Sequence, residues 1–221
     1  VGNVPVGGLT VGDHAANVTV VDGNYSGSNS TTFAVAVKPV NVAVAVEGIT
    51  YGDDANVTVK SDVDGEYLVY VDGTPYSVNV TGGVGDVPVG GLTVGDHVAN
   101  VTVVDGNYSG SDSITFAVAV KQVNVAVAVD GITYGDDAKV IVKSDVDGEY
   151  LVYVDDAPYA VTVSDGVGNV PVGGLTVGDH AANVTVVDGN YSGSNSTTFA
   201  VAIKQVNVAV AVDGITYGDD A

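Results

Sequence analysis

Short runs in which apolar residues alternate with small or polar ones fill this chain, and clusters of glycine and aspartate separate the runs. Alternation with a period of two places the apolar side chains on one face of a β-strand. No window shows a helical period. Pro88 has no amide to donate to a neighbouring strand, so it indicates an edge strand. The segment 67–71 is apolar on both faces, as in a central strand. Within residues 39–121 the pattern predicts seven strands, with apolar positions in the segments 42–46, 57–59, 67–71, 76–80, 87–89, 99–103 and 116–120.

The whole pattern recurs every 83 residues, and residues 1–55 differ from residues 167–221 at only three positions. A long period that is held this closely is typical of an array of small domains. Seven short strands in about 80–100 residues favour an immunoglobulin-like β-sandwich. We therefore predict an all-β chain of tandem immunoglobulin-like domains. Its expected parts are the C-terminal part of one repeat at 1–38, complete repeats at 39–121 and 122–204, and the N-terminal part of a further repeat at 205–221, as in a window from a longer array.

Differences between the two complete copies support the predicted strand faces. Four of these differences fall on positions expected to face solvent: Asn56/Lys139, Thr58/Ile141, Ser77/Ala160 and Asn79/Thr162. The proposed core valines and tyrosines from Val42 to Val118 are the same in both copies. The junction between repeats is the dipeptide Lys38-Pro39, whose length and proline predict a stiff linker and a semi-rigid rod.

The strands beside this junction carry alanine where a solvated strand usually carries polar residues. This small, uncharged face is either ordinary tolerated surface or a contact with a neighbouring domain or another chain. The candidate interface residues are Ala34, Ala36, Ala43 and Ala45.

Composition narrows the classes of function. The formal net charge is −21, with 27 acidic residues against six lysines and no arginine, so a nucleic-acid partner or an anionic membrane is not expected. Cysteine is absent, which excludes disulfides and thiolate metal sites, and no apolar run is long enough to span a membrane.

Acidic turns are the candidate metal sites, because calcium prefers clustered oxygen ligands on a tight turn. The rest of an EF-hand loop is missing, however, so an acidic turn between strands is the alternative reading, and no cofactor is required. The calcium candidates are Asp53, Asp54, Asp62, Asp64, Glu66, Asp136, Asp137, Asp145, Asp147 and Glu149.

Asn-x-Ser/Thr sequences are frequent, and they predict glycosylation of a surface protein. The candidate asparagines are Asn17, Asn24, Asn29, Asn56, Asn79, Asn100, Asn107, Asn183, Asn190 and Asn195. Three histidines, His14, His97 and His180, share one repeat position directly after an aspartate and are interpreted as turn residues that open the sixth strand. No catalytic residue is predicted.

Three motifs resemble a known family. They are Tyr51-Gly52-Asp53-Asp54-Ala55-Asn56-Val57-Thr58-Val59, then Gly91-Leu92-Thr93-Val94-Gly95-Asp96-His97, and then Asp105-Gly106-Asn107-Tyr108-Ser109-Gly110-Ser111 followed by Thr115-Phe116-Ala117-Val118. Their order and spacing resemble the bacterial-type immunoglobulin-like (Big-type) tandem repeats of adhesin-like cell-surface proteins of archaea and bacteria. The resemblance implies an extracellular stalk, adhesin or filament without catalytic residues.

Our expectation is an extracellular structural protein whose tandem repeats form a surface stalk or filament for adhesion or cell–cell linkage. Its expected partners are neighbouring repeats, other copies of the chain in a fibre, or glycans of a host or cell surface. Two alternatives stay open. One is a glycan-binding array, with Tyr25, Tyr51 and Tyr76 as candidate platforms, and the other is an accessory segment of a large surface enzyme.

Overall fold

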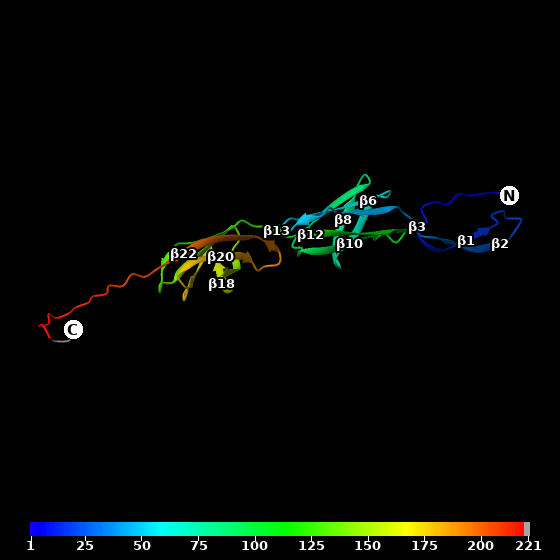
Figure 1. Ribbon diagram of the computed structural model, residues 1–221. Helices are drawn as coiled ribbons and strands as arrows, with labels where there is room; N and C mark the ends of the chain where they lie inside the picture. The colour runs from blue at the N-terminus through cyan, green and yellow to red at the C-terminus, as the bar shows by residue number, and fades with distance from the viewer. Residues whose placement is uncertain (219–221) are drawn as a thin grey trace. The chain divides into compact units, whose positions relative to one another are not determined.

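The computed structural model describes residues 1–218, and it contains strands and loops but no helix within that range. It divides into two compact units, residues 1–120 and 121–221. Each unit contains one complete sandwich, and the first unit also contains the antiparallel hairpin of β1 (Gly12–Thr19) and β2 (Ser28–Val35) (Figure 1).

The sandwich of the first unit has a three-stranded antiparallel sheet in the order β4-β6-β9 and a five-stranded sheet in the order β5-β12-β10-β7-β8. The three-stranded sheet consists of β4 (Val42–Ala45), β6 (Ala55–Ser61) and β9 (Val84–Val89). The five-stranded sheet consists of β5 (Ile49–Thr50), β7 (Gly65–Val71), β8 (Thr74–Val80), β10 (Gly95–Val103) and β12 (Ser111–Ala119). β5 is the one strand of this sheet that pairs in parallel, with β12.

The second unit repeats this topology, with the orders β14-β16-β19 and β15-β22-β20-β17-β18. Its three-stranded sheet consists of β14 (Val125–Val129), β16 (Ala138–Ser144) and β19 (Val167–Val172). Its five-stranded sheet consists of β15 (Ile132–Thr133), β17 (Gly148–Val154), β18 (Ala157–Val163), β20 (Gly178–Val186) and β22 (Ser194–Ala202). The predicted fold, tandem immunoglobulin-like β-sandwiches, is therefore confirmed.

Each core forms where the inward faces of the two sheets meet. In the first unit, Val57 and Val59 of β6 pack in one cluster with Tyr67 and Val69 of β7, and all four are almost fully buried. Valine suits these positions because a β-branched side chain fits the pleated, buried surface. The seven predicted strands are all present, β7 lies inside its sheet, and β9, which contains Pro88, is an edge strand as predicted.

One predicted core position is wrong. Val120 lies just past the end of β12 and is 37 % exposed. The ladder of β12 ends where Ala119 pairs with Thr50, so the alternation no longer fixes the side on which the next residue lies. On the predicted outward positions, Thr58 and Ile141 are half-buried and the others are exposed: Asn56, Ser77, Asn79, Lys139, Ala160 and Thr162.

The junction dipeptide belongs to the sandwich that follows it. β3 (Lys38–Pro39) pairs in parallel with β11 (Tyr108–Ser109), and the Lys38 amide donates to the Asn107 carbonyl at 2.9 Å. β13 (Lys121–Gln122) and β21 (Tyr191–Ser192) repeat this pairing in the second unit. The junction residues are thus hydrogen-bonded within a sandwich, while the expected stiffness of the junction and the exact domain limits stay predictions.

Two backbone positions depend on residue type. The turn between β7 and β8 has positive φ at both Asp72 (49°) and Gly73 (84°), as a two-residue type I′ hairpin requires. Gly85 of β9 is buried, and a Cβ there would lie 2.5 Å from the Asn79 carbonyl oxygen, so only glycine lets β9 pass this close to β8.

Candidate functional site

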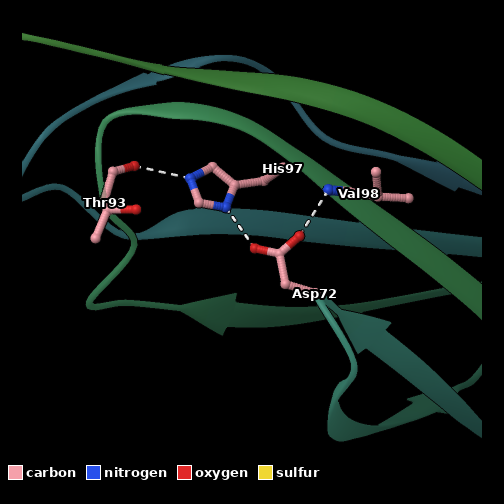
Figure 2. A network of polar contacts seen from close by, with 4 residues as sticks. All are labelled: Asp72, Thr93, His97 and Val98. Atoms are coloured by element: carbon pink, nitrogen blue, oxygen red, sulfur yellow. Dashed lines mark hydrogen bonds and ion pairs between the residues drawn. The ribbon is translucent and has the colours of Figure 1, made fainter.

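A histidine in one strand and an aspartate in a tight turn meet at the same place in both sandwiches. In the first unit, Asp72 directly follows the central strand β7 in its tight turn, and β10 runs beside β7 with Ala99 opposite Val71. This pairing brings the start of β10, which carries His97, next to the turn. Figure 2 shows the His97 ring between the Asp72 carboxylate and the backbone of Thr93.

Four hydrogen bonds define this pair, named here the His–Asp latch (His97 with Asp72, and His180 with Asp155). His97 Nδ1 lies 2.5 Å from Asp72 Oδ2, and His97 Nε2 lies 2.7 Å from the Thr93 carbonyl oxygen. The other carboxylate oxygen, Asp72 Oδ1, accepts the Val98 amide at 3.0 Å, and the Asp72 amide donates to the Val98 carbonyl. The latch thus ties the β7–β8 turn and the loop before β10 to β10 itself.

The surroundings favour the charged forms of both groups. Both ring nitrogens of His97 face oxygen acceptors, so a doubly protonated ring satisfies both. The hydrogen bond that the ring donates to the Asp72 carboxylate, and then the one that it donates to the Thr93 carbonyl oxygen, raises the pKa of His97. The same bond to His97, followed by the Val98 amide, lowers the pKa of Asp72. The ring contacts Phe116 in a tilted arrangement, with centroids 5.6 Å apart, and is buried at the edge of the core.

The second unit repeats this arrangement. His180 Nδ1 pairs with Asp155 Oδ2, its Nε2 lies 2.8 Å from the Thr176 carbonyl oxygen, and the Ala181 amide donates to Asp155. The pKa of His180 is raised, and that of Asp155 lowered, by their mutual hydrogen bond first. His14 keeps the backbone contact, 2.7 Å to the Thr10 carbonyl oxygen, and the stacked ring of Phe33, but residues 1–218 provide it with no carboxylate partner.

The latch is built to hold structure. In a serine-protease-type triad, the nitrogen that faces away from the aspartate contacts a hydroxyl nucleophile. Here that nitrogen, Nε2 of His97, contacts a backbone carbonyl oxygen, which cannot act as a nucleophile of that kind. The geometry therefore supports cross-linking of a turn to a strand in a chain without disulfides.

Sequence reasoning found the histidines but missed their partners. The aspartate directly before each histidine faces away from the core and is exposed, as Asp96 shows. The true partner, Asp72, stands 25 positions earlier in the chain. The sequence contains one indication that this aspartate matters. Both copies have aspartate at this position (Asp72 and Asp155), although the next residue changes from Gly73 to Asp156.

The predicted calcium residues do not come together. The candidate carboxylates from the end of β6 into β7 each have their own partner: Asp62 accepts from Asn41, and Glu66 of β7 accepts from Ser77 Oγ at 2.6 Å. Asp64 accepts the amides of Gly82 and Gly83 at 2.9 and 3.0 Å, and these bonds lower the pKa of Asp64.

The second unit uses the equivalent carboxylates in the same way. Asp145 accepts from Asn124, Asp147 from the Asp165 and Gly166 amides, and Glu149 from Thr162. The remaining candidates, Asp53, Asp54, Asp136 and Asp137, lie exposed in loops. Within residues 1–218, no three His, Cys, Asp or Glu side chains are grouped as a metal ion requires. Calcium binding stays a prediction from the sequence.

The predicted modification and interface residues are accessible. All the candidate asparagines are exposed except Asn190, which is half-buried, and Asn107 additionally donates to Asp105 at 2.9 Å. Ala34, Ala36, Ala43 and Ala45 are exposed as well. Tyr25 is 73 % exposed, whereas Tyr51 and Tyr76 pack partly against the core.

A cleft at one end of the sandwich recurs in both units. In the first unit it has a volume of about 290 Å³ and is lined by Asp64, Glu66, Asp105 and Tyr108, together with valines. The second unit has the equivalent cleft, with a volume of about 310 Å³. Its combination of an aromatic ring with carboxylates is a candidate site for a small polar ligand.

Comparisons with known proteins identify no family. No family model matches the chain, and no curated protein matches it. Among solved structures, it is similar to the adhesin InvE of Yersinia pseudotuberculosis, at 16 % identity over 73 % of this chain and 60 % of that one, with a TM-score of 0.43. It is also similar to the titin domains Z1Z2 in complex with telethonin, at 12 % identity over 77 % of this chain and all of that one (TM-score 0.39).

A third match is to the fibronectin(III)-like modules of CbhA from Clostridium thermocellum, at 13 % identity over 78 % of this chain and all of that one (TM-score 0.34). No helix among residues 1–218 is long and apolar enough to cross a membrane.

Proposed function

We propose that this chain is part of an extracellular cell-surface protein in which tandem immunoglobulin-like sandwiches form a stalk or filament for adhesion or cell–cell linkage. One observation carries the proposal. Two nearly identical repeats each form a complete sandwich with its own core. Repeating one self-contained domain lengthens the protein, whereas an enzyme needs its catalytic site only once.

Further features support this role. An acidic surface with a net charge of −21 keeps a long array soluble, and exposed Asn-x-Ser/Thr asparagines suit glycosylation outside the cell. Both sandwiches are fastened by the His–Asp latch, and disulfides are absent. The order and spacing of the repeat motifs favour the Big-type repeats of adhesin-like proteins as the nearest family, and no catalytic role is assigned.

Force spectroscopy and localisation test the proposal together. Single molecules pulled from their ends should unfold one sandwich at a time, each event releasing roughly 280 Å of chain less the folded length, since an extended residue spans about 3.4 Å. Antibodies against the chain should label the surface of unbroken cells of the producing organism. Labelling only after the cells are broken open would refute the extracellular assignment.

The recurring cleft favours a second candidate, glycan recognition, because aromatic rings beside carboxylates are suited to bind sugar hydroxyls. A polysaccharide array probed with the folded chain tests this function. Binding that is lost on Tyr108→Ala together with Tyr191→Ala would support it, and an array without signal would reject it.

A further inference from the structure

The outward face of each five-stranded sheet carries neutral polar side chains around a tyrosine. In the first unit, Val69 and Val71 are buried, so the alternation along β7 turns Tyr70 outward. The strand register sets one row across four strands: Pro75 beside Tyr70, Tyr70 beside Asn100, and Asn100 beside Ser113. The row spans about 14 Å, because neighbouring strands lie about 4.8 Å apart.

A second row runs parallel to the first. It consists of Ser77, Leu68, Thr102 and Ser111. The two rows border a shallow groove with a volume of about 450 Å³, named here the sheet groove, which is lined mainly by Tyr70, Asn100, Thr102, Ser111 and Ser113. Tyr70 and Thr102 are half-buried, and the other three are exposed.

The sheet groove is neutral although the protein is strongly acidic. One carboxylate, Asp112, lies beside it, but Asp112 stands opposite the buried Val101 and its Oδ2 accepts the Val44 amide of the other sheet at 3.0 Å. The carboxylates just beyond the two rows already have partners: Glu66 with Ser77, and Asp72 with His97. A net charge of −21 repels anionic ligands, and the lining side chains offer no charge to attract a cation.

The polar side chains of the groove have no partners in the protein. Within residues 1–218, the side chains of Tyr70, Asn100, Ser111 and Ser113 make no hydrogen bond. Elsewhere on the same sandwich, outward polar groups pair with one another, as Thr58 Oγ1 does with Asp86 Oδ1 at 2.6 Å. The groove thus presents unpaired amide and hydroxyl groups, which both donate and accept, beside an aromatic ring.

The second unit repeats both rows in the same register. Tyr153 lies beside Pro158 and Asn183, and Asn183 lies beside Ser196. The second row is Ala160, Leu151, Thr185 and Ser194, in which only Ala160 differs from the first unit. Asn195 replaces Asp112, so the one carboxylate beside the groove is replaced by an amide.

We propose that the sheet groove binds a neutral oligosaccharide, with one site on each sandwich. The apolar face of a sugar ring packs on an aromatic side chain, and sugar hydroxyls take the place of water around unpaired polar groups. Tyr70 supplies the ring, and Asn100 and Ser113 supply donors and acceptors in the same row. The site shares no residue with the cleft beside Tyr108, so it does not rest on the glycan recognition considered for that cleft.

This ligand has two possible sources with the same chemistry. One is a glycan or polysaccharide of another molecule. The other is a glycan on the chain itself, because the rows contain the glycosylation sequences Asn100-Val101-Thr102 and Asn183-Val184-Thr185. A glycan on Asn100 would begin inside the groove, next to Tyr70.

Isothermal titration calorimetry tests the proposal on the full chain made in a host that adds no glycans. The probes are neutral oligomers of glucan, mannan and galactan, and oligogalacturonate is the anionic comparison. A neutral oligomer should bind with one site per sandwich, and its affinity should hardly change between about 0.01 and 1 M salt, because no charge contributes. If no neutral oligomer binds, or if only oligogalacturonate binds, the proposal is overturned.

Paired substitutions place the sugar on the groove. Tyr70→Ala with Tyr153→Ala should weaken binding at least roughly tenfold, since aromatic side chains contribute most to such contacts. Asn100→Ala with Asn183→Ala alters only exposed side chains and should weaken binding as well. The control is Asn79→Ala with Asn169→Ala, which changes exposed strand asparagines outside the groove and should bind normally.

Circular dichroism melts verify that each variant folds. If folded variants of both groove pairs bind normally, the proposal is overturned. The same holds if binding is lost with Tyr108→Ala and Tyr191→Ala but kept with the Tyr70 pair, because the sugar then lies in the cleft.

Material from the native source distinguishes the two sources. Sugar mass on the Asn100 peptide, together with a native chain that no longer binds the probe, identifies the chain's own glycan as the occupant. A bare Asn100 peptide and a native chain that binds the probe identify a separate glycan. A native chain that carries sugar on both Asn100 and Asn183 and still binds at full strength overturns the placement of the site. These outcomes do not depend on where the protein is located, so surface labelling can fail while binding succeeds, and the reverse.

Discussion

Replacing Asp72 and Asp155 with asparagine removes the carboxylate from both His–Asp latches and keeps the shape of the side chain. The asparagine oxygen can still accept the amide of Val98 or Ala181. What is lost is the charge that stabilises the protonated ring of His97 or His180. The prediction is a chain that folds but loses most of the pH dependence of its stability above pH 5.

The signs follow from the directions of the two pKa shifts. The pKa of His97 is raised in the folded state, so its stabilisation is complete below the unfolded value of about 6.5 and is lost as pH rises through the raised value. The pKa of Asp72 is lowered, so its stabilisation is complete above about 3.9 and is lost as pH falls through the lowered value. Both contributions are therefore complete between about pH 4 and 6.5.

The size of the effect follows from the contacts. A hydrogen bond to a charged group contributes about 1.5–3 kcal/mol to stability. The His97 side chain is only 8 % exposed, but Asp72 is 45 % exposed, so solvent screening reduces the expected loss to about 1 kcal/mol per sandwich. For a domain of this size, that corresponds to a decrease in melting temperature of about 4–8 °C.

The assay is urea unfolding at about pH 5.5 and about pH 9, on either side of the unfolded histidine pKa. The unmodified chain should be more stable at the lower pH, and the double asparagine variant should lose about 1 kcal/mol per sandwich there and little at the higher pH. Asp53→Asn with Asp136→Asn is the control, since it makes the same change of charge on exposed loops away from the latch. If the double variant keeps the pH dependence of the unmodified chain, the latch is not its origin.

The remaining predictions concern single backbone positions and ions. Gly85→Ala should destabilise the first sandwich by about 2 kcal/mol or more in a thermal melt, because the alanine Cβ would lie 2.5 Å from the Asn79 carbonyl oxygen. The control, Gly106→Ala, should have little effect, because a Cβ there would have no atom within 4 Å. Asp156 has φ of 68° where the first unit has Gly73, so Asp156→Gly should stabilise the second sandwich by about 0.5–1 kcal/mol; an unchanged urea midpoint would contradict this. If the loop carboxylates bind calcium, a chelator should lower the melting temperature, and an unchanged value would remove calcium as a ligand.

The sequence by itself determined the strands, their inward faces and the tandem domain class. Side chains alternate strictly along a strand, so a run such as Val42, Val44 and Val46 shows its buried face without reference to any other segment. Pro88 marked an edge strand for an equally local reason, since proline has no amide to donate to a neighbour. The alternation predicted the wrong side only for Val120, which lies just past the end of β12.

Only the tertiary structure decided which distant residues meet. Asp72 reaches His97 because β7 lies between β8 and β10. The alternation of apolar residues along each strand does not predict this strand order. Likewise, Lys38 lies beside Tyr108 only because β3 pairs with β11. Strand periodicity is a local property, whereas strand order and register depend on the packing of the whole sandwich, and the latch is a product of that packing.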